Sequence, residues 1–74
     1  MPALLPVISG REAVRAFERV GWQVARRKGS HIHMVHPENR AILSIPDHKE
    51  LDRGTLRSLI RKAELAVGDF VQLL

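Results

Sequence analysis

A change in the spacing of apolar residues is the feature that most constrains the fold of this chain. Near the start, apolar residues recur three or four positions apart, as on one face of a helix: Ala13, Val14, Phe17 and Val20. From Trp22 onward apolar and polar residues alternate instead, which is typical of a strand with one buried face. Helical spacing then returns in a last set: Leu56, Leu59, Ile60 and Ala63. The 74 residues therefore predict a helix, several strands and a second helix.

Short motifs mark both ends of the first helix. Ser9 stands three positions before Glu12, so each side chain can accept a hydrogen bond from the backbone N–H of the other residue, as in a capping box. Gly21 follows the last apolar residue and readily adopts the left-handed conformation that ends many helices. We therefore expect the first helix over about Arg11–Val20.

The alternating segment divides into three predicted strands. The first begins at Trp22, the second covers His31–His36, and the third covers Ala41–Ile45 and ends before a proline. The basic turn Arg26-Arg27-Lys28-Gly29-Ser30 joins the first two strands. Pro37-Glu38-Asn39-Arg40 has the composition of a turn between the second and the third. These short connections predict a three-stranded antiparallel meander.

Two amphipathic helices can cover only one face of such a sheet, so the other face is expected to be open. On the second strand Ile32 and Met34 are predicted to face the helices, which leaves His31 and His33 on the open face beside the basic turn. The first strand is predicted to be half-buried, with two sets of residues on opposite faces: Trp22, Val24 and Arg26, and Gln23, Ala25 and Arg27. The predicted fold class is α+β, with both helices on one face of the sheet.

The second helix is predicted to start at Asp52, its N-cap, and to end near Leu65. Gly68 interrupts the helical spacing, and four apolar residues follow it: Phe70, Val71, Leu73 and Leu74. This segment, 68–74, is predicted to form a short closing helical turn, and the alternative is an apolar tail that awaits a partner. We expect one domain over residues 1–74 with its core within about 9–67.

Composition limits the classes of partner and compartment. Twelve Lys and Arg against eight Asp and Glu give a formal net charge of +4, which favours a phosphate-rich or acidic partner. The absence of cysteine excludes disulfides and thiolate metal sites. No stretch reaches the ~18 apolar residues of a membrane helix, and Met1–Ile8 lacks the basic start and long apolar run of a targeting signal. We expect a mature N-terminus, no membrane partner and a cytoplasmic location.

The basic turn and the histidine after it have the residue types that RNA cleavage requires. An imidazole can take the proton from a ribose 2′-hydroxyl while nearby cations hold the scissile phosphate. The candidate base is His31, and the candidate RNA contacts are the five residues before it: Arg26, Arg27, Lys28, Gly29 and Ser30. This reaction needs neither a metal nor another cofactor. On spacing alone, a solvated turn with a surface histidine is the commoner interpretation.

The remaining histidines allow other interpretations. A metal site would need several of the four imidazoles: His31, His33, His36 and His48. Strand parity argues against it, because His36 falls on the opposite face from His31 and His33, so no metal is expected. His33 and His48 are candidates for an auxiliary catalytic role, although an exposed sheet residue and a polar loop residue are the simpler interpretations. His36 is expected beside the turn, near the edge of the helix-covered face.

A set of motifs follows in fixed order along the chain: Gly21-Trp22, Arg27-Lys28-Gly29-Ser30-His31, His36-Pro37, Ile45-Pro46-Asp47-His48, Lys49-Glu50-Leu51 and Gly54-Thr55-Leu56-Arg57-Ser58-Leu59-Ile60-Arg61-Lys62-Ala63. The set resembles the HicA-type (YcfA-like) toxin family over Ser9–Leu73. The resemblance implies a fold like that of double-stranded-RNA-binding domains, with the order helix, three strands, helix. This order agrees with the one predicted from periodicity.

The resemblance also implies a function. It implies a translation-independent mRNA interferase, an endoribonuclease that acts as the toxin of a type II toxin–antitoxin pair and inhibits translation by cleaving mRNA or other single-stranded RNA. A HicB-type antitoxin is expected to bind the toxin and cover its active site. The family's catalytic histidine falls on His31, and Gly29 and Ser30 match the same motif. His33, His48 or water is left as the source of the leaving group's proton.

A noncatalytic RNA-binding module of the same fold is the alternative function. A double-stranded-RNA binder is expected to carry a basic cluster at the start of its second helix, where it meets the phosphates across the major groove. In this chain Glu50 and Asp52 dilute the cations of that region, which are Lys49, Arg53 and Arg57. The dilution favours the toxin.

Overall fold

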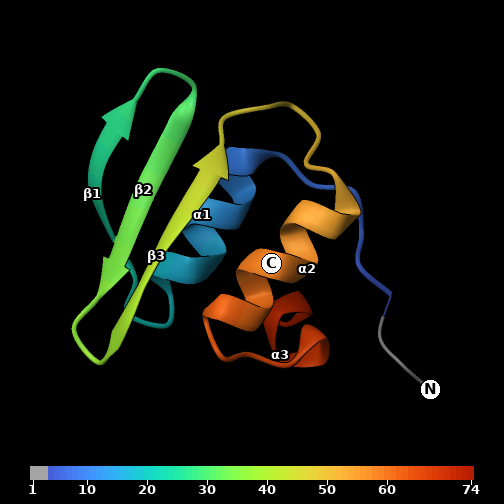
Figure 1. Cartoon of the computed structure of the whole chain (residues 1–74). Helices are drawn as coiled ribbons and strands as arrows, with labels where there is room; N and C mark the ends of the chain where they lie inside the picture. Colours follow the sequence, from blue (N-terminus) through green and yellow to red (C-terminus); the bar gives the residue numbers. More distant parts are fainter. Residues whose placement is uncertain (1–3) are drawn as a thin grey trace.

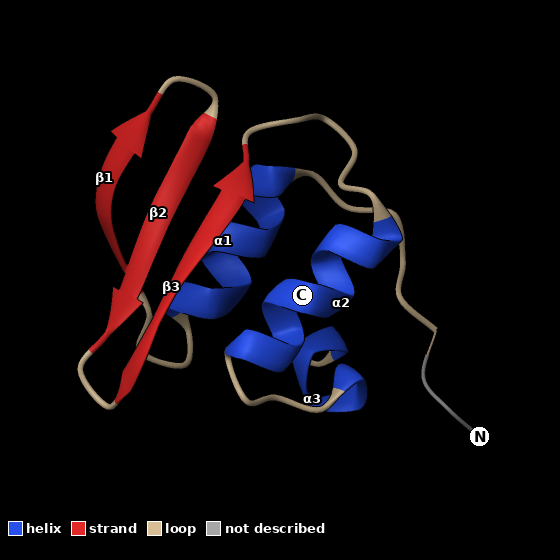
Figure 2. Ribbon diagram, in the orientation of Figure 1, coloured by secondary structure: helices blue, strands red, loops and turns tan. Residues whose placement is uncertain are grey.

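The computed structural model describes residues 4–74, which fold into three helices and one antiparallel sheet (Figure 1). The elements follow in the order α1 (Gly10–Glu18), β1 (Gln23–Lys28), β2 (His31–His36), β3 (Asn39–Pro46), α2 (Arg53–Lys62) and α3 (Val67–Val71). The strands lie in the order β1-β2-β3, and the helices pack on one face of the sheet (Figure 2). The predicted α+β fold is confirmed. Residues 1–3, part of the segment considered as a targeting signal, lie outside the described range.

Hydrogen bonds at both ends of α1 show why the helix has these limits. The Ser9 hydroxyl accepts from the Glu12 backbone N–H at 3.1 Å, and the Glu12 carboxylate accepts from the Ser9 N–H at 3.1 Å, which completes the predicted capping box. After the helix, Gly21 has a positive φ of 99°, and the Trp22 N–H donates to the Phe17 carbonyl at 3.2 Å. These bonds form a Schellman motif with Gly21 in its left-handed position.

The second helix starts as predicted and ends earlier. The Asp52 carboxylate accepts from the Thr55 N–H at 3.1 Å and caps the first turn of α2. The helix stops at Lys62 rather than near Leu65, because Glu64 has a positive φ of 60° and turns the chain. The Leu65 N–H then donates to the Ile60 carbonyl at 3.1 Å, which closes a second Schellman motif.

Two-residue turns connect the strands. Lys28 pairs with His31 across Gly29-Ser30, and Gly29 has a φ of 59°, the left-handed conformation that a type II′ turn requires at its first central residue. His36 pairs with Asn39 across the second turn, so β3 begins two residues before the predicted Ala41. The turn is shorter than predicted because Asn39 already belongs to the ladder.

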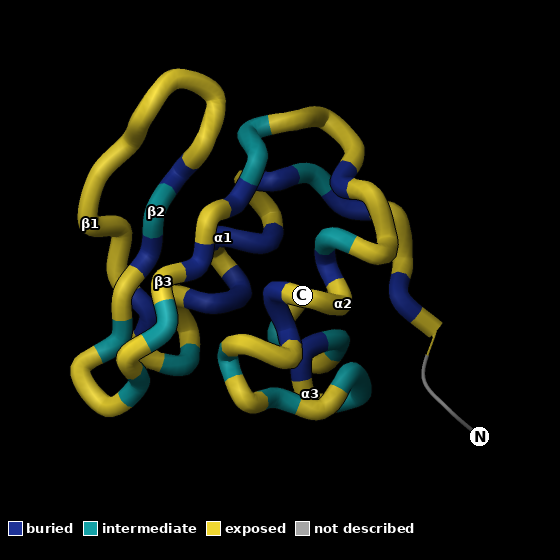
Figure 3. The backbone as a smooth tube through the Cα atoms, viewed as in Figure 1, coloured by how far each residue is buried: buried dark blue, intermediate teal, exposed yellow. Residues whose placement is uncertain are grey.

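One apolar core lies between the helices and the sheet (Figure 3). Its largest fully buried side chains are Phe17, Met34, Leu43, Ile45, Leu56, Ile60 and Phe70. Phe70 belongs to α3 and lies 5.0 Å from the ring of Phe17, so the predicted closing helical turn is confirmed. Leu5 is also buried, and the core therefore extends beyond the predicted range 9–67 on both sides.

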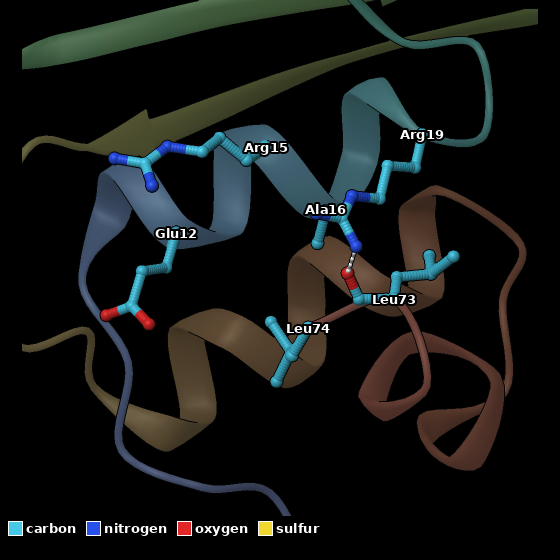
Figure 4. Close-up of a pocket in the computed structure, with 6 residues that line it drawn as sticks. All are labelled: Glu12, Arg15, Ala16, Arg19, Leu73 and Leu74. Atoms are coloured by element: carbon cyan, nitrogen blue, oxygen red, sulfur yellow. Dashed lines mark hydrogen bonds between the residues drawn. The ribbon is translucent and has the colours of Figure 1, made fainter.

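The last residues of the chain are tied to the first helix. The Arg19 guanidinium donates from Nη1 to the Leu73 carbonyl oxygen at 2.9 Å (Figure 4). Together with the packing of Phe70, this bond holds the segment after α2 against α1.

The first strand differs from its prediction in burial and in parity. All six residues of β1 are exposed, whereas the buried strand residues lie on the other two strands: Ile32, Met34, Leu43 and Ile45. The prediction of a half-buried first strand was wrong because the helices bury side chains of β2 and β3 but none of β1. A β-bulge also lies between Val24, which pairs with Met34, and Arg26, which pairs with His33. The inserted residue puts Val24 and Arg26 on opposite faces, not on one face as predicted.

Candidate functional site

Strand pairing places two histidines and two cations in adjacent rows on the open face. Lys28 pairs with His31, and Arg26 pairs with His33. Side chains directly opposite each other in an antiparallel pair have Cβ atoms about 4.5–5.5 Å apart. Met34 is fully buried on the helix side, so its neighbour His33 points to the open face, as predicted.

His31 lies at the end of the sheet, directly after the first turn. Its side chain is exposed, with Lys28 as its partner on β1 and Pro46 as its partner on β3. A Cβ added at Gly29 would meet no heavy atom within 4 Å, so the space beside the turn is open. Gly29 and Ser30 are both exposed.

Arg27 lies apart from this row of side chains. It pairs with Ile32, whose side chain is buried against the helices, so Arg27 is on the helix side of the sheet. Its guanidinium donates from Nη2 to Asp47 Oδ2 at 2.6 Å and from Nε to the Gly29 carbonyl at 3.2 Å. Of the three predicted cations, the structure therefore brings Arg26 and Lys28 to the histidines, whereas Arg27 pairs with Asp47 and braces the turn from behind.

Asp47 is the residue at this site that sequence reasoning missed. Its carboxylate is only 12% exposed and also accepts from Arg11 Nε at 3.3 Å, while its N–H donates to the Ser30 carbonyl at 2.7 Å. The hydrogen bond from Arg27, followed by that from Arg11, holds the pKa of Asp47 below its usual value. Asp47 thus connects the turn before His31 to α1. The sequence alone carried no signal for this role, because it depends on the register that pairs Pro46, the residue before Asp47, with His31.

His36 has a structural role on the helix side. Its Nδ1 accepts from the Glu38 N–H at 3.0 Å, and because a backbone N–H can only donate, Nε2 must carry the proton. Nε2 then donates to the Val20 carbonyl at 3.0 Å, and the ring lies 5.3 Å from that of Trp22. The predicted place of His36 beside the turn, away from the open face, is confirmed.

The two remaining histidines, His33 and His48, lie on different elements. His33 is half-exposed and lies between Arg26 on β1 and Ser44 on β3. His48 is exposed in the loop after β3, where its carbonyl accepts from the Gly10 N–H at 2.9 Å. Across residues 4–74, no group of three or more histidine or carboxylate side chains is arranged to hold a metal ion.

None of the helices within residues 4–74 is both long and apolar enough to span a bilayer.

Comparison with known protein families identifies a relationship over most of the chain. The model of a family described as the HicA toxin of bacterial toxin–antitoxin systems matches residues 10–65, from the start of α1 to the residue that closes the Schellman motif after α2. Individually curated proteins give no match. The family match covers the basic turn, all three strands and both long helices, which is well over half of the chain. The chain therefore belongs to the HicA toxin family of bacterial toxin–antitoxin systems.

Proposed function

We propose that this toxin is an mRNA interferase, a metal-independent endoribonuclease in which a single histidine, His31, is the catalytic base. The observation that carries the proposal is the position of His31, exposed at the end of the open face and paired with Lys28. Family membership supports a toxin with an RNA substrate and an antitoxin partner in general. The residues around His31 supply the finer assignment.

Each step of the cleavage has a group to perform it. His31 accepts the proton of a ribose 2′-hydroxyl as the 2′-oxygen attacks the adjacent phosphorus and the bond to the 5′-oxygen breaks. The products are a 2′,3′-cyclic phosphate and a 5′-hydroxyl, which takes a proton from water, His33 or His48. His33 is the better placed of these two histidines, because it lies two residues from His31 on the same face. The Lys28 ammonium stabilises the charge that develops on the phosphate.

The cradle for the scissile phosphate is proposed to be the turn and its flanking cations. Lys28 and Arg26 contribute charge from β1, while Gly29 and Ser30 offer backbone and hydroxyl hydrogen bonds. Arg27 acts through the turn, because it binds the Gly29 carbonyl and Asp47. A HicB-type antitoxin is proposed to neutralise the toxin by covering this surface.

RNA degradation in EDTA by the purified protein tests the proposal. Wild type is expected to cleave single-stranded RNA, and His31→Ala is expected to lose cleavage while keeping the wild-type thermal midpoint, because His31 is exposed. Gel analysis of a labelled RNA and a thermal melt of both proteins provide the two measurements. Equal cleavage by His31→Ala, or loss of wild-type cleavage in EDTA, would contradict the proposal. Binding of RNA without cleavage by either protein would favour a noncatalytic RNA-binding module.

A further inference from the structure

We infer that the open face of the sheet is a binding surface for single-stranded RNA, in which a groove beside His33 accepts a nucleobase next to the cleavage position. The inference deepens the proposed function and rests on it. It concerns how the substrate is held, and it involves residues beyond the turn that precedes His31.

The groove crosses all three strands. It has a volume of about 630 Å³ and is lined by Ala25, Arg26, His33, Val35, Ile42 and Ser44. Two of these are large apolar side chains that are exposed to solvent, Val35 at 38% and Ile42 at 57%. His33 connects the groove to His31, two residues away on the same strand. An RNA strand that places a phosphate at His31 therefore brings its neighbouring nucleotide over the groove.

The charge on this face matches a polyanion. In the described structure none of the residues that form β1, β2 and β3 is acidic. Three cations project from the open face: Arg26, Lys28 and Arg40. Arg40 lies on β3, two residues before Ile42, and therefore on the same face as Ile42. Phosphates along a strand can meet these cations while the bases contact the apolar floor. A purely apolar partner would leave the same cations without counterions.

The β-bulge shapes the groove. Because the ladder passes from Val24 directly to Arg26, the inserted Ala25 and the following Arg26 both line the open face. Ala25 is small and leaves space above the sheet. Arg26 also lines the groove, and its planar guanidinium can stack on a base. Bulges commonly redirect a side chain next to a binding site in this manner.

The chemistry of the groove favours a single strand over a duplex. An apolar floor with neighbouring His and Arg side chains contacts the faces of bases, and only unpaired bases expose those faces. A duplex presents phosphates and groove edges, which are polar and do not offer the base faces that Val35 and Ile42 would contact. The occupant to which the structure points is therefore an unpaired nucleotide.

Binding measurements on variants of Ile42 test the inference. In a His31→Ala background with EDTA, we would titrate a fluorescent single-stranded RNA and the corresponding duplex with the full chain and follow anisotropy. Ile42→Asn removes the more exposed of the two large apolar side chains of the groove and is expected to weaken single-strand binding at least about fivefold, whereas Ile42→Trp adds a stacking surface and is expected to tighten it by a similar factor. Duplex affinity is expected to stay the same.

The matched control is Val7→Asn, because Val7 is 58% exposed, like Ile42, but lies in the segment before α1. It is expected to bind RNA as the parent does. Unchanged single-strand affinity in both Ile42 variants, or equal losses for single strand and duplex, would overturn the inference. If RNA binding is unchanged and only neutralisation by the antitoxin is lost, the face is a protein-docking surface and the inference is equally overturned.

Cleavage assays separate this inference from the proposed function. If wild type cleaves RNA in EDTA and the Ile42 variants bind and cleave as wild type does, the proposed function stands and the groove assignment fails. If wild type does not cleave but Ile42→Asn weakens single-strand binding, the groove assignment stands and the nuclease fails.

Discussion

The two faces of the sheet are built from the same three strands and have opposite properties. On the helix side, Leu43 and Ile45 are completely buried in a core without a buried polar side chain among residues 4–74. On the open side, the neighbouring Ile42 and Ser44 are exposed, and cations and histidines surround them. Because side chains alternate along a strand, one register buries one set of residues in the core and leaves the other set exposed, where we propose that RNA binds. The faces should therefore respond to substitution independently.

The largest expected effect comes from adjacent residues of β3. Leu43→Ala should lower the free energy of unfolding by about 2–5 kcal/mol, because it leaves a cavity in the core, while Ile42→Ala should change it by less than about 1 kcal/mol. Urea unfolding of the two variants gives both values. Similar losses at the two positions would mean that the open face is packed against something in the folded protein.

A second contrast uses two histidines of β2. His36→Ala should cost about 1–3 kcal/mol of stability, since it leaves the Val20 carbonyl and the Glu38 N–H without their partner. His31→Ala should cost less than about 0.5 kcal/mol and should abolish cleavage. Thermal or urea unfolding, paired with the RNA assay, separates the roles. Unfolding of His31→Ala would show that His31 supports the fold.

Two neighbouring arginines of β1, Arg26 and Arg27, should differ in how they affect the salt dependence of RNA binding. Arg26→Ala should reduce the slope of log affinity against log salt by about 0.7, because one phosphate contact to single-stranded RNA is lost. Arg27→Ala should leave that slope nearly unchanged and slightly lower stability, because it releases Asp47 and the turn. Titrations of RNA at several salt concentrations measure the slopes. The reverse assignment of slopes would place Arg27, not Arg26, on the RNA-binding face.

The smallest expected effect is the acid response of Asp47. Its lowered pKa means that the carboxylate adds stability above the ordinary value of 3.8, and that this stability is lost as the pH falls through the lower folded value. Asp47→Asn should therefore be less stable than wild type at neutral pH, and the difference should shrink in strong acid. Urea midpoints across this pH range provide the measurement. Glu50→Gln, which removes an exposed carboxylate from the same loop, is the control.

Features governed by local sequence were predictable. The capping box of Ser9 and Glu12 and the Gly21 turn depend on residues a few positions apart, and both formed as predicted. The alternation of β2 also predicted the placement of Ile32 and His31, because a regular strand has only one way to divide its side chains. The structure therefore confirms the predicted faces of the β2 side chains, whereas the catalytic and RNA-binding roles stay predictions.

Features that depend on tertiary contacts were not predictable. The bulge at Ala25 carries no residue type that marks it, yet it moved Arg26 to the open face and Arg27 to the other. Glu64 ended α2 in a conformation usually left to glycine. Asp47 became recognisable only when the register placed it beside Ser30. Each case needs knowledge of which segments meet in space.

The bulge in β1 has a consequence for solubility. β1 is an edge of the sheet, and an edge strand with free backbone groups can recruit strands of other molecules and start aggregation. The irregular ladder at Ala25 and the consecutive charges of Arg26, Arg27 and Lys28 make this edge a poor template for such pairing. The feature that directs Arg26 to the open face thus also disfavours strand addition at this edge of the sheet.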